Sequence, residues 1–286
     1  MIRLDAATVL LQWATGGLLF LWVTTRRREV GIGYGWLLRI VYAVLAAGAL
    51  AVGVFVDPVP LREACSAAVA VAASVALVVS IVRRKAGVAG ERARRERKAA
   101  RVAAMAGRAS GDGATGGPTA AVAEFPPALD LVAPLIGVVG LVAAGVAAGG
   151  PHALAVARTL AGALFLGAVS DAMLLGHWYL VQPGLGRGPL LELNRWLALT
   201  WPLEVGLLLW PTGMLSVLSG SVDDGWGGTL GWFWVACALT TLVLTGVTKA
   251  ALKERAYSAV MAATGLLYLA ILTAFGTDLV ARAVLT

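Results

Sequence analysis

Eight long apolar runs constrain the fold of this chain more than any other feature of its sequence. Each run reaches the length of about 20 residues that an α-helix needs to cross a bilayer, and the fifth and sixth are long enough to tilt or to project past it. The runs cover residues 7–25, 34–56, 62–82, 129–148, 153–181, 189–218, 229–248 and 256–283. The whole chain is 59% hydrophobic and 14% charged, whereas soluble domains carry roughly 25% charged residues. We therefore expect an all-α, polytopic membrane helix bundle with about eight transmembrane helices.

The spacing of the runs predicts how the chain is organised. Residues 1–82 should hold the first three helices, residues 83–128 a basic arm and a Gly-rich linker, and residues 129–286 five further helices. We expect all eight helices to form one bundle. Transmembrane strands are not expected, because the runs lack period-two alternation. The first run lacks the basic start and cleavage site of a signal peptide, so we expect it to remain as a helix.

The basic residues of the loops predict an orientation. Lys and Arg in short loops favour the cytoplasm. They gather after the first, third and seventh runs, whereas the loops after the second, fourth and sixth runs are acidic or nearly neutral. This alternation predicts eight spans with both termini outside, in a bacterial-type inner (plasma) membrane. It also accounts for most of the net charge of +7, so the charge does not indicate nucleic-acid binding.

The loop after the third run is the most basic segment. It reads RRKAGVAGERARRERKAARVAAMAGR and is rich in helix formers, so we expect the third helix to continue into the cytoplasm. Cations near an anionic leaflet are attracted to it. The side chains expected to dock anionic lipid headgroups or a partner subunit are Arg83, Arg84, Lys85, Arg94, Arg95, Arg97 and Lys98. The alternative is a solvated segment that only fixes topology.

Two similar segments suggest an internal repeat. VGIGYGWLLRI follows the first run and PGLGRGPLLEL follows the fifth. The aligned residues are Gly31, Gly33, Gly35, Leu37 and Leu38 in the first and Gly184, Gly186, Gly188, Leu190 and Leu191 in the second. The alignment suggests a parallel 4+4 repeat about an axis along the membrane normal. Chance similarity between segments rich in Gly and Leu is the alternative.

Ionisable residues concentrate in the fifth and sixth runs. His177 lies nine residues before the turn at Gly186 and Arg195 nine residues after it, so both should lie near the cytoplasmic surface. Asp171 and Glu204 should lie deeper, where a charge costs at least about 2.5–3.5 kcal/mol. We therefore expect both carboxyls to face the interior of the bundle. Two carboxyls close together would be suited to carry a proton.

Other residues of this hairpin complete the candidate site. Glu192 can pair with Arg195 on its own helix, and that pair would then be structural. For His177, the alternative to a proton relay or quinone contact is an interfacial side chain bonded to its neighbours. The predicted proton pathway or ligand pocket comprises Asp171, His177, Glu192, Arg195, Trp201 and Glu204.

Two prolines are expected to interrupt the sixth run. Proline lacks a backbone N–H and leaves a carbonyl one turn earlier without its helical donor. Pro202 and Pro211 would free the carbonyls of Ala198 and Leu207. Interrupted membrane helices are tolerated where they line a cavity or are buried in protein, so Pro202 favours a cavity beside Glu204.

Histidine and cysteine usage limits the cofactors. His152 and His177 lie at opposite ends of the fifth run, so they cannot both ligate one haem. No His/Cys cluster suits zinc, and we predict no metal site. Cys65 and Cys237 are more typical of helix packing than of a disulfide. We expect no cofactor held within the chain alone, and consider a quinone or a haem shared with a partner subunit.

Nucleotide, hydrolase and metalloprotease motifs are absent, so no catalytic centre of its own is expected. The favoured hypothesis is an integral membrane subunit of a larger redox or proton-handling complex, with other membrane subunits as partners. It would contribute a buried polar pathway or a quinone-adjacent pocket on the fifth and sixth helices. The alternatives are a proton-coupled small-solute transporter and a non-catalytic membrane scaffold or assembly factor.

Overall fold

The secondary structure that can be described is entirely helical. The computed structural model describes residues 5–105, 124–182, 184–211, 213–254 and 256–285. The elements are α1 (Ala6–Thr25), α2 (Ile32–Val56), α3 (Pro60–Val82), α4 (Arg84–Met105), the 3₁₀ helix η1 (Pro127–Leu131), α5 (Val132–Ala147), α6 (His152–Val181), α7 (Gly188–Leu209), α8 (Gly213–Leu218), α9 (Thr229–Ala251) and α10 (Tyr257–Val284).

Seven helical segments are long and apolar enough to cross a membrane: α1, α2, α3, η1 with α5, α6, α9 and α10. This confirms a multi-pass membrane protein by helix length and hydropathy. The helix predicted over residues 189–218 is divided. Its main part, α7, carries Glu192, Arg195 and Glu204 and so is the most charged of the long helices in the bundle. It nevertheless packs along α6 and α9.

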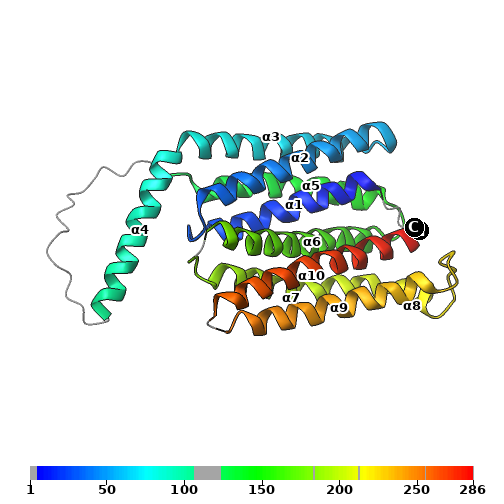
Figure 1. The fold of residues 1–286 in the computed structure, drawn as a ribbon. Coiled ribbons are helices and arrows are strands. Elements are labelled where there is room, and N and C mark those ends of the chain that lie inside the picture. Colours follow the sequence, from blue (N-terminus) through cyan, green and yellow to red (C-terminus); the bar gives the residue numbers. More distant parts are fainter. Residues whose placement is uncertain (1–4, 106–123, 183, 212, 255, 286) are drawn as a thin grey trace.

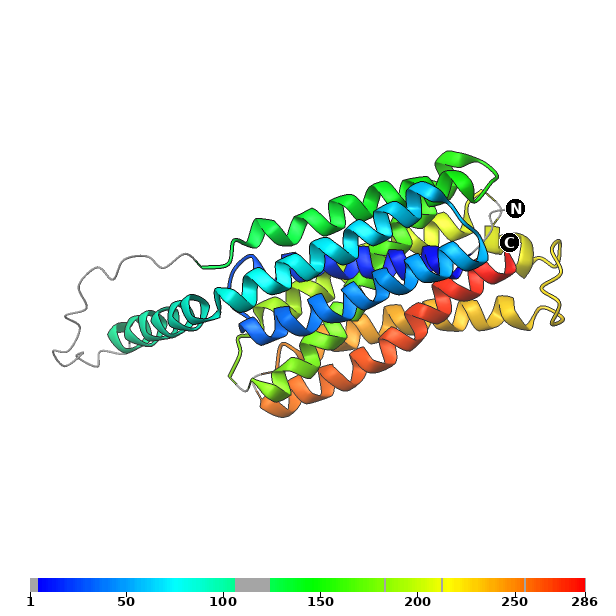
Figure 2. The ribbon, with the colours of Figure 1, turned by 90° about the horizontal axis from the view of Figure 1, so that it is seen from above.

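The long helices pack as two rings of four. In the first ring α1 contacts α2, α2 contacts α3, α3 contacts α5, and α5 contacts α1. In the second ring α6 contacts α7, α7 contacts α9, α9 contacts α10, and α10 contacts α6. The rings meet mainly through α1 and α6, which therefore occupy the centre of the bundle (Figures 1 and 2).

Glycines allow the two central helices to approach closely. A Cβ on Gly167 of α6 would stand 2.6 Å from the Cα of Gly16 on α1, a distance that real Cβ atoms do not show. Close backbone approach through small residues is typical of membrane helix pairs. Around this crossing lies the main apolar core, in which Leu18, Phe165 and Leu166 are fully buried.

The basic loops lie at one end of the bundle. The turn 26–31, the junction of α3 with α4, the end of α6 and the end of α9 are at that end, whereas α1 begins and α10 ends at the other (Figure 1). The segment after α3 is helical, as expected, but it does not extend α3. A turn at Arg83 separates the two helices, and α4 leaves the bundle at an angle (Figure 1).

Only one of the two prolines interrupts the sixth predicted helix. α7 continues through Pro202, which is exposed on its surface. It ends at Leu209, just before Pro211, and the chain resumes as the short helix α8. Cys65 and Cys237 are both free and buried. They lie on α3 and α9, in different rings.

Candidate functional site

Four ionisable side chains from three helices meet inside the second ring, toward the end where α10 finishes. We call Arg158, Glu204, Asp278 and Arg282 the acid–arginine cluster. Glu204 and Asp278 are completely buried, and Arg158 is 8% exposed. Glu204 interacts electrostatically with Asp278, Arg282 and Arg158. Arg158 lies in the second turn of α6 and Arg282 in the last turn of α10, so the cluster lies away from α4.

The two arginines are held by backbone carbonyls as well as by acids. Arg282 Nε donates to Asp278 Oδ1 at 2.6 Å, and its terminal nitrogen donates to the carbonyl of Arg158 at 3.1 Å. Arg158 donates to the carbonyls of Leu207 at 2.9 Å and Trp210 at 2.5 Å. Leu207 is the residue whose carbonyl Pro211 was expected to free. An arginine of α6 therefore supplies the donor that proline removes from α7.

Glu204 differs from the other buried acids. Asp130, for comparison, receives two hydrogen bonds from the guanidinium of Arg39, at 2.8 and 2.7 Å. Of the described residues, Glu204 is the one whose two carboxyl oxygens are both buried without a protein donor. It nevertheless interacts electrostatically with Asp278. Two neighbouring carboxylates repel each other, and a proton on one of them removes that repulsion, so the pair is suited to hold one proton.

A glycine and a buried amide side chain border the acid–arginine cluster. A Cβ on Gly162 would stand 2.8 Å from the amide nitrogen of Gln12 and 2.9 Å from Asp278 Oδ1. Gln12 of α1 is fully buried and donates to the carbonyl of Thr159 at 2.6 Å. Its side-chain oxygen has no partner among the described residues. The cluster thus reaches the interface between the two rings.

Asp171 occupies a second polar site, nearer the middle of α6. One carboxyl oxygen accepts a hydrogen bond from the hydroxyl of Tyr42, and the other is buried without a described partner. The hydroxyl of Tyr34 donates to the backbone carbonyl of Asp171 at 3.4 Å. Beside it, the indole of Trp13 donates to Ser170 at 2.8 Å. Asp171 is thus bonded to a side chain of α2, whereas Glu204 interacts with α6 and α10. The two acids share no partner.

The remaining residues of the predicted hairpin site lie apart from both clusters. Glu192 is half-buried and pairs with Arg26 at 2.5 Å and Arg27 at 3.3 Å, both just after α1, rather than with Arg195. Arg195 is exposed. His177 is exposed, and its Nδ1 lies 3.0 Å from the hydroxyl of Tyr268 on α10.

Trp201 packs within the second ring. Its indole N–H donates to the backbone carbonyl of Ala238 on α9 at 2.9 Å. It therefore ties α7 to α9.

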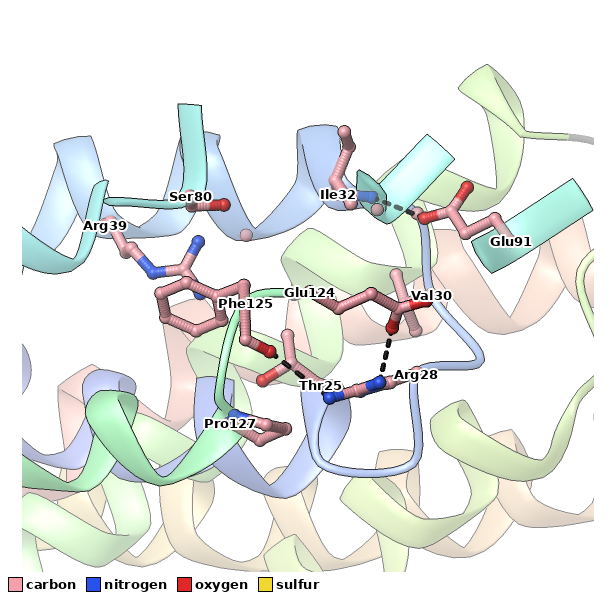
Figure 3. A pocket seen from close by; sticks show the side chains of 13 residues that line it. Thr25, Arg28, Val30, Ile32, Arg39, Ser80, Glu91, Glu124, Phe125 and Pro127 are labelled. Atoms are coloured by element: carbon pink, nitrogen blue, oxygen red, sulfur yellow. Dashed lines mark hydrogen bonds and ion pairs between the residues drawn. The ribbon is translucent and has the colours of Figure 1, made fainter. Parts of the chain in front are cut away.

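A small cavity with charged and apolar lining residues lies at the α4 end of the first ring (Figure 3). It has a volume of about 60 Å³ and is bordered by Thr25, Arg28, Arg39, Glu91 and Glu124, among others. Arg28 pairs with Glu124, and Glu91 accepts the backbone N–H of Ile32 at 3.0 Å. Apolar residues such as Val30, Phe125 and Pro127 line it as well, and it has room for a few water molecules.

The predicted docking residues begin at the turn before α4, where Arg83 lies, and continue along α4. Arg83, Arg84, Lys85 and Arg97 are exposed, and Arg83 donates to the carbonyl of Glu124 at 3.2 Å. The side chains of Arg94, Arg95 and Lys98, and residues 106–123 of the linker, lie outside the described part of the chain. Among the described residues, no three His, Cys, Asp or Glu side chains gather as metal ligands would.

Sequence reasoning missed three of the four residues in the acid–arginine cluster. Arg158 lies within the fifth apolar run, and Asp278 and Arg282 lie four residues apart within the eighth. The criterion applied to Asp171, an ionisable group inside an apolar run, applies equally to them. The sequence did not indicate which helices pack against Glu204. The structure shows that α10 does so as well as α6.

Comparison with known protein families, curated proteins and solved structures finds no match to this chain. The class of protein is therefore defined by its own fold and side chains. It is a multi-pass α-helical membrane protein with polar clusters buried inside the bundle.

Proposed function

We propose that this protein handles protons as an integral subunit of a larger membrane complex, and that Glu204 with Asp278 is its proton-carrying group. The observation that carries the proposal is that both Glu204 oxygens are buried beside Asp278 and receive no hydrogen bond from any described residue. A buried carboxyl whose oxygens receive no hydrogen bond from a donor is costly and marks function more often than stability.

The surroundings of the carboxyl pair support this role. Arg158 and Arg282 balance the charge when both acids are ionised, and protonation of Glu204 leaves one excess positive charge. The net charge of the cluster is therefore zero or +1 in the two protonation states. A group that gains and loses a proton in a low-dielectric interior requires such a small net charge. Asp171 with Tyr42 is the second polar station, and the cavity of Figure 3 is the point of water entry at the α4 end.

The proposal includes an orientation. α7 is the eighth span, because it runs alongside α6 and α9 and its buried acid faces the bundle. With eight spans the basic loops share one end, which we assign to the cytoplasm, and both termini lie outside. The membrane is a bacterial-type inner membrane.

We also propose that the two rings are halves of a parallel 4+4 repeat. Each ring repeats the same order of contacts, and the first helices of the two rings form their interface. A Cβ on Gly140 would lie 2.7 Å from Cys65, and one on Gly276 would lie 2.7 Å from Cys237, so equivalent helix pairs make the same close contact. Leu38 and Leu190 are both fully buried, so we align them with each other. This shifts the alignment of the two segments by one residue from the one that the glycines suggest.

Within the complex, the exposed groups would meet the partners. His177 and Tyr268 form an exposed polar pair on α6 and α10, suited to contact a quinone or a haem shared with another subunit. The projecting helix α4 would dock a partner subunit or anionic lipid. Proton movement, in this proposal, is coupled to the redox chemistry of the partners.

Purification in mild detergent and vesicle measurements test the proposal. The wild-type protein, Glu204→Gln and the exposed-site control Glu254→Gln would each be isolated from native membranes. Co-purifying proteins and absorbance spectra would be recorded, and substrate-driven proton movement measured in vesicles. We expect all three proteins to assemble with the same partners, and only Glu204→Gln to lose proton movement.

The other outcomes distinguish the alternatives. A protein that purifies alone and without colour contradicts membership of a redox complex. Solute flux by the lone protein in vesicles, abolished by Glu204→Gln, would instead identify a proton-coupled transporter. Full proton movement in Glu204→Gln would leave a scaffold or assembly role.

A further inference from the structure

A basic groove lies where α4 bends away from the bundle. It has a volume of about 340 Å³ and is bordered by Ile32 and Trp36 of α2 and by Arg84, Lys85, Val88, Ala89 and Arg92 of α4. The α4 residues follow helical spacing, so one face of α4 presents two arginines and a lysine toward α2. This groove shares Ile32 with the cavity of Figure 3, but Glu91 and Glu124, which border that cavity, do not border the groove.

The three cations of the groove are not paired with an acid in the described part of the chain. Among the described residues, no carboxylate pairs with Arg84, Lys85 or Arg92, whereas Arg28, Arg39 and Arg62 are each paired with an acid. Arg83 instead donates a hydrogen bond to the backbone carbonyl of Glu124 and does not border the groove. The groove therefore concentrates positive charge that the protein itself leaves uncompensated.

The other walls of the groove are apolar and fixed. Trp36 is half-buried, and its indole N–H donates to Ser80 of α3 at 3.0 Å, which orients the ring. Buried Ala86 and the contact of Gly87 with Ile32 hold the start of α4 against α2. The groove thus combines cations on one side with an aromatic and aliphatic wall at the end of the membrane-spanning helices.

We infer that the groove between α2 and α4 binds the phosphate headgroup of one anionic phospholipid. The phosphate would lie among Arg84, Lys85 and Arg92, and the first part of the acyl chains would pass Trp36 and Ile32 into the bilayer. Anionic lipids are enriched in the cytoplasmic leaflet, to which we assign this end of the bundle. The inference deepens the docking role proposed for α4, but it does not depend on proton transfer by Glu204.

Native mass spectrometry of the delipidated full-length protein in detergent tests the inference. The protein would be titrated with phosphatidylglycerol, with phosphatidylcholine and with inorganic phosphate. We expect one phosphatidylglycerol to bind at least tenfold more tightly than phosphatidylcholine. The triple variant R84Q/K85Q/R92Q should lose that preference, and the control R27Q/K249Q/K253Q, with the same loss of charge from exposed residues at the same end, should keep it.

Three results would overturn the inference. Equal loss of binding in both triple variants would indicate diffuse attraction by the basic end. Displacement of the lipid by millimolar inorganic phosphate would indicate a site for a free anion.

A photoactivatable phosphatidylglycerol provides a second measurement on the wild-type protein, because cross-links outside residues 32–36 and 84–92 also contradict the site. Lipid binding in detergent is independent of proton movement, so either proposal can fail without the other.

Discussion

Gly16 of α1 and Gly167 of α6 lie backbone against backbone at the centre of the bundle, where the two rings of helices meet. A Cβ on Gly167 would stand 2.6 Å from both the Cα and the carbonyl oxygen of Gly16. The crossing therefore sets the distance between the rings, and with it the position of Gln12 beside the acid–arginine cluster.

Substitution of Gly167 by alanine should separate α1 from α6. We expect the free energy of unfolding to fall by about 1–3 kcal/mol, because the added methyl group meets backbone atoms that cannot rotate away. The control is Gly265→Ala on α10, where nothing lies within 4 Å of the added Cβ and alanine favours the helix by about 1 kcal/mol. Thermal stability in detergent, followed by size-exclusion chromatography, measures both. Equal stability of the two variants would contradict the close crossing.

Arg158→Gln should destabilise the protein through two losses at once. The carbonyls of Leu207 and Trp210 lose their donor, and Glu204 loses a neighbouring positive charge. We expect a cost of about 2–4 kcal/mol. The double variant Arg158→Gln with Glu204→Gln should recover part of it, because the uncompensated acid is gone. If the two substitutions are simply additive in thermal melting, Arg158 does not act on Glu204.

Tyr42→Phe should weaken the contact between α2 and α6. The hydroxyl is a donor to the Asp171 carboxyl inside the bundle, and its removal leaves both carboxyl oxygens without a described donor. A loss of about 1–2 kcal/mol is expected. Tyr34→Phe is the matched control, because that hydroxyl reaches only a backbone carbonyl at 3.4 Å. A larger loss for Tyr34→Phe than for Tyr42→Phe would contradict this assignment.

The start of α9 should open at low pH. Backbone N–H groups of Gly228, Trp226, Leu230 and Gly231 donate to Asp224 and lower its pKa below the usual value. The carboxylate therefore stabilises the loop above its unfolded pKa of about 3.9, and this contribution disappears as the pH falls through the lowered value.

Hydrogen exchange of the amides at 226–231 measures this opening. Exchange, corrected for its intrinsic pH dependence, should rise only below about pH 4 in the wild-type protein. Asp224→Ala should show fast exchange at every pH. Protection that persists in Asp224→Ala would show that the carboxylate does not hold the turn.

The helices themselves could be predicted from composition and run length. The end of the α6 segment was predicted at residue 181, as observed, and α9 and α10 begin within one residue of their predicted starts. Apolar runs bounded by charge and glycine are strong local signals, because the bilayer leaves the backbone few alternatives to a helix. The freed carbonyl of Leu207 was also predictable, since it follows from the covalent structure of Pro211.

The partners of the buried acids were not predictable in the same way. Asp171 and Glu204 were considered as one pair because they lie at similar distances from a turn, but depth along two helices does not specify the direction in which each side chain points. The acid nearest to Glu204 belongs to α10, 74 residues further along the chain. Similarly, Glu192 pairs with arginines that follow α1 rather than with Arg195 on its own helix.

The sequence by itself determined that this chain forms long apolar helices with ionisable residues inside them, because transfer of the backbone and of apolar side chains into lipid depends on local composition. Only the tertiary structure decided that Glu204 meets Asp278 between two arginines, and that α4 turns away from α3 to form a basic groove with α2. These contacts join residues far apart in sequence. They depend on which helix faces pack together. Glycines such as Gly16 and Gly167 influence this packing because they let two helices approach closely, an effect that appears only when the helices are packed.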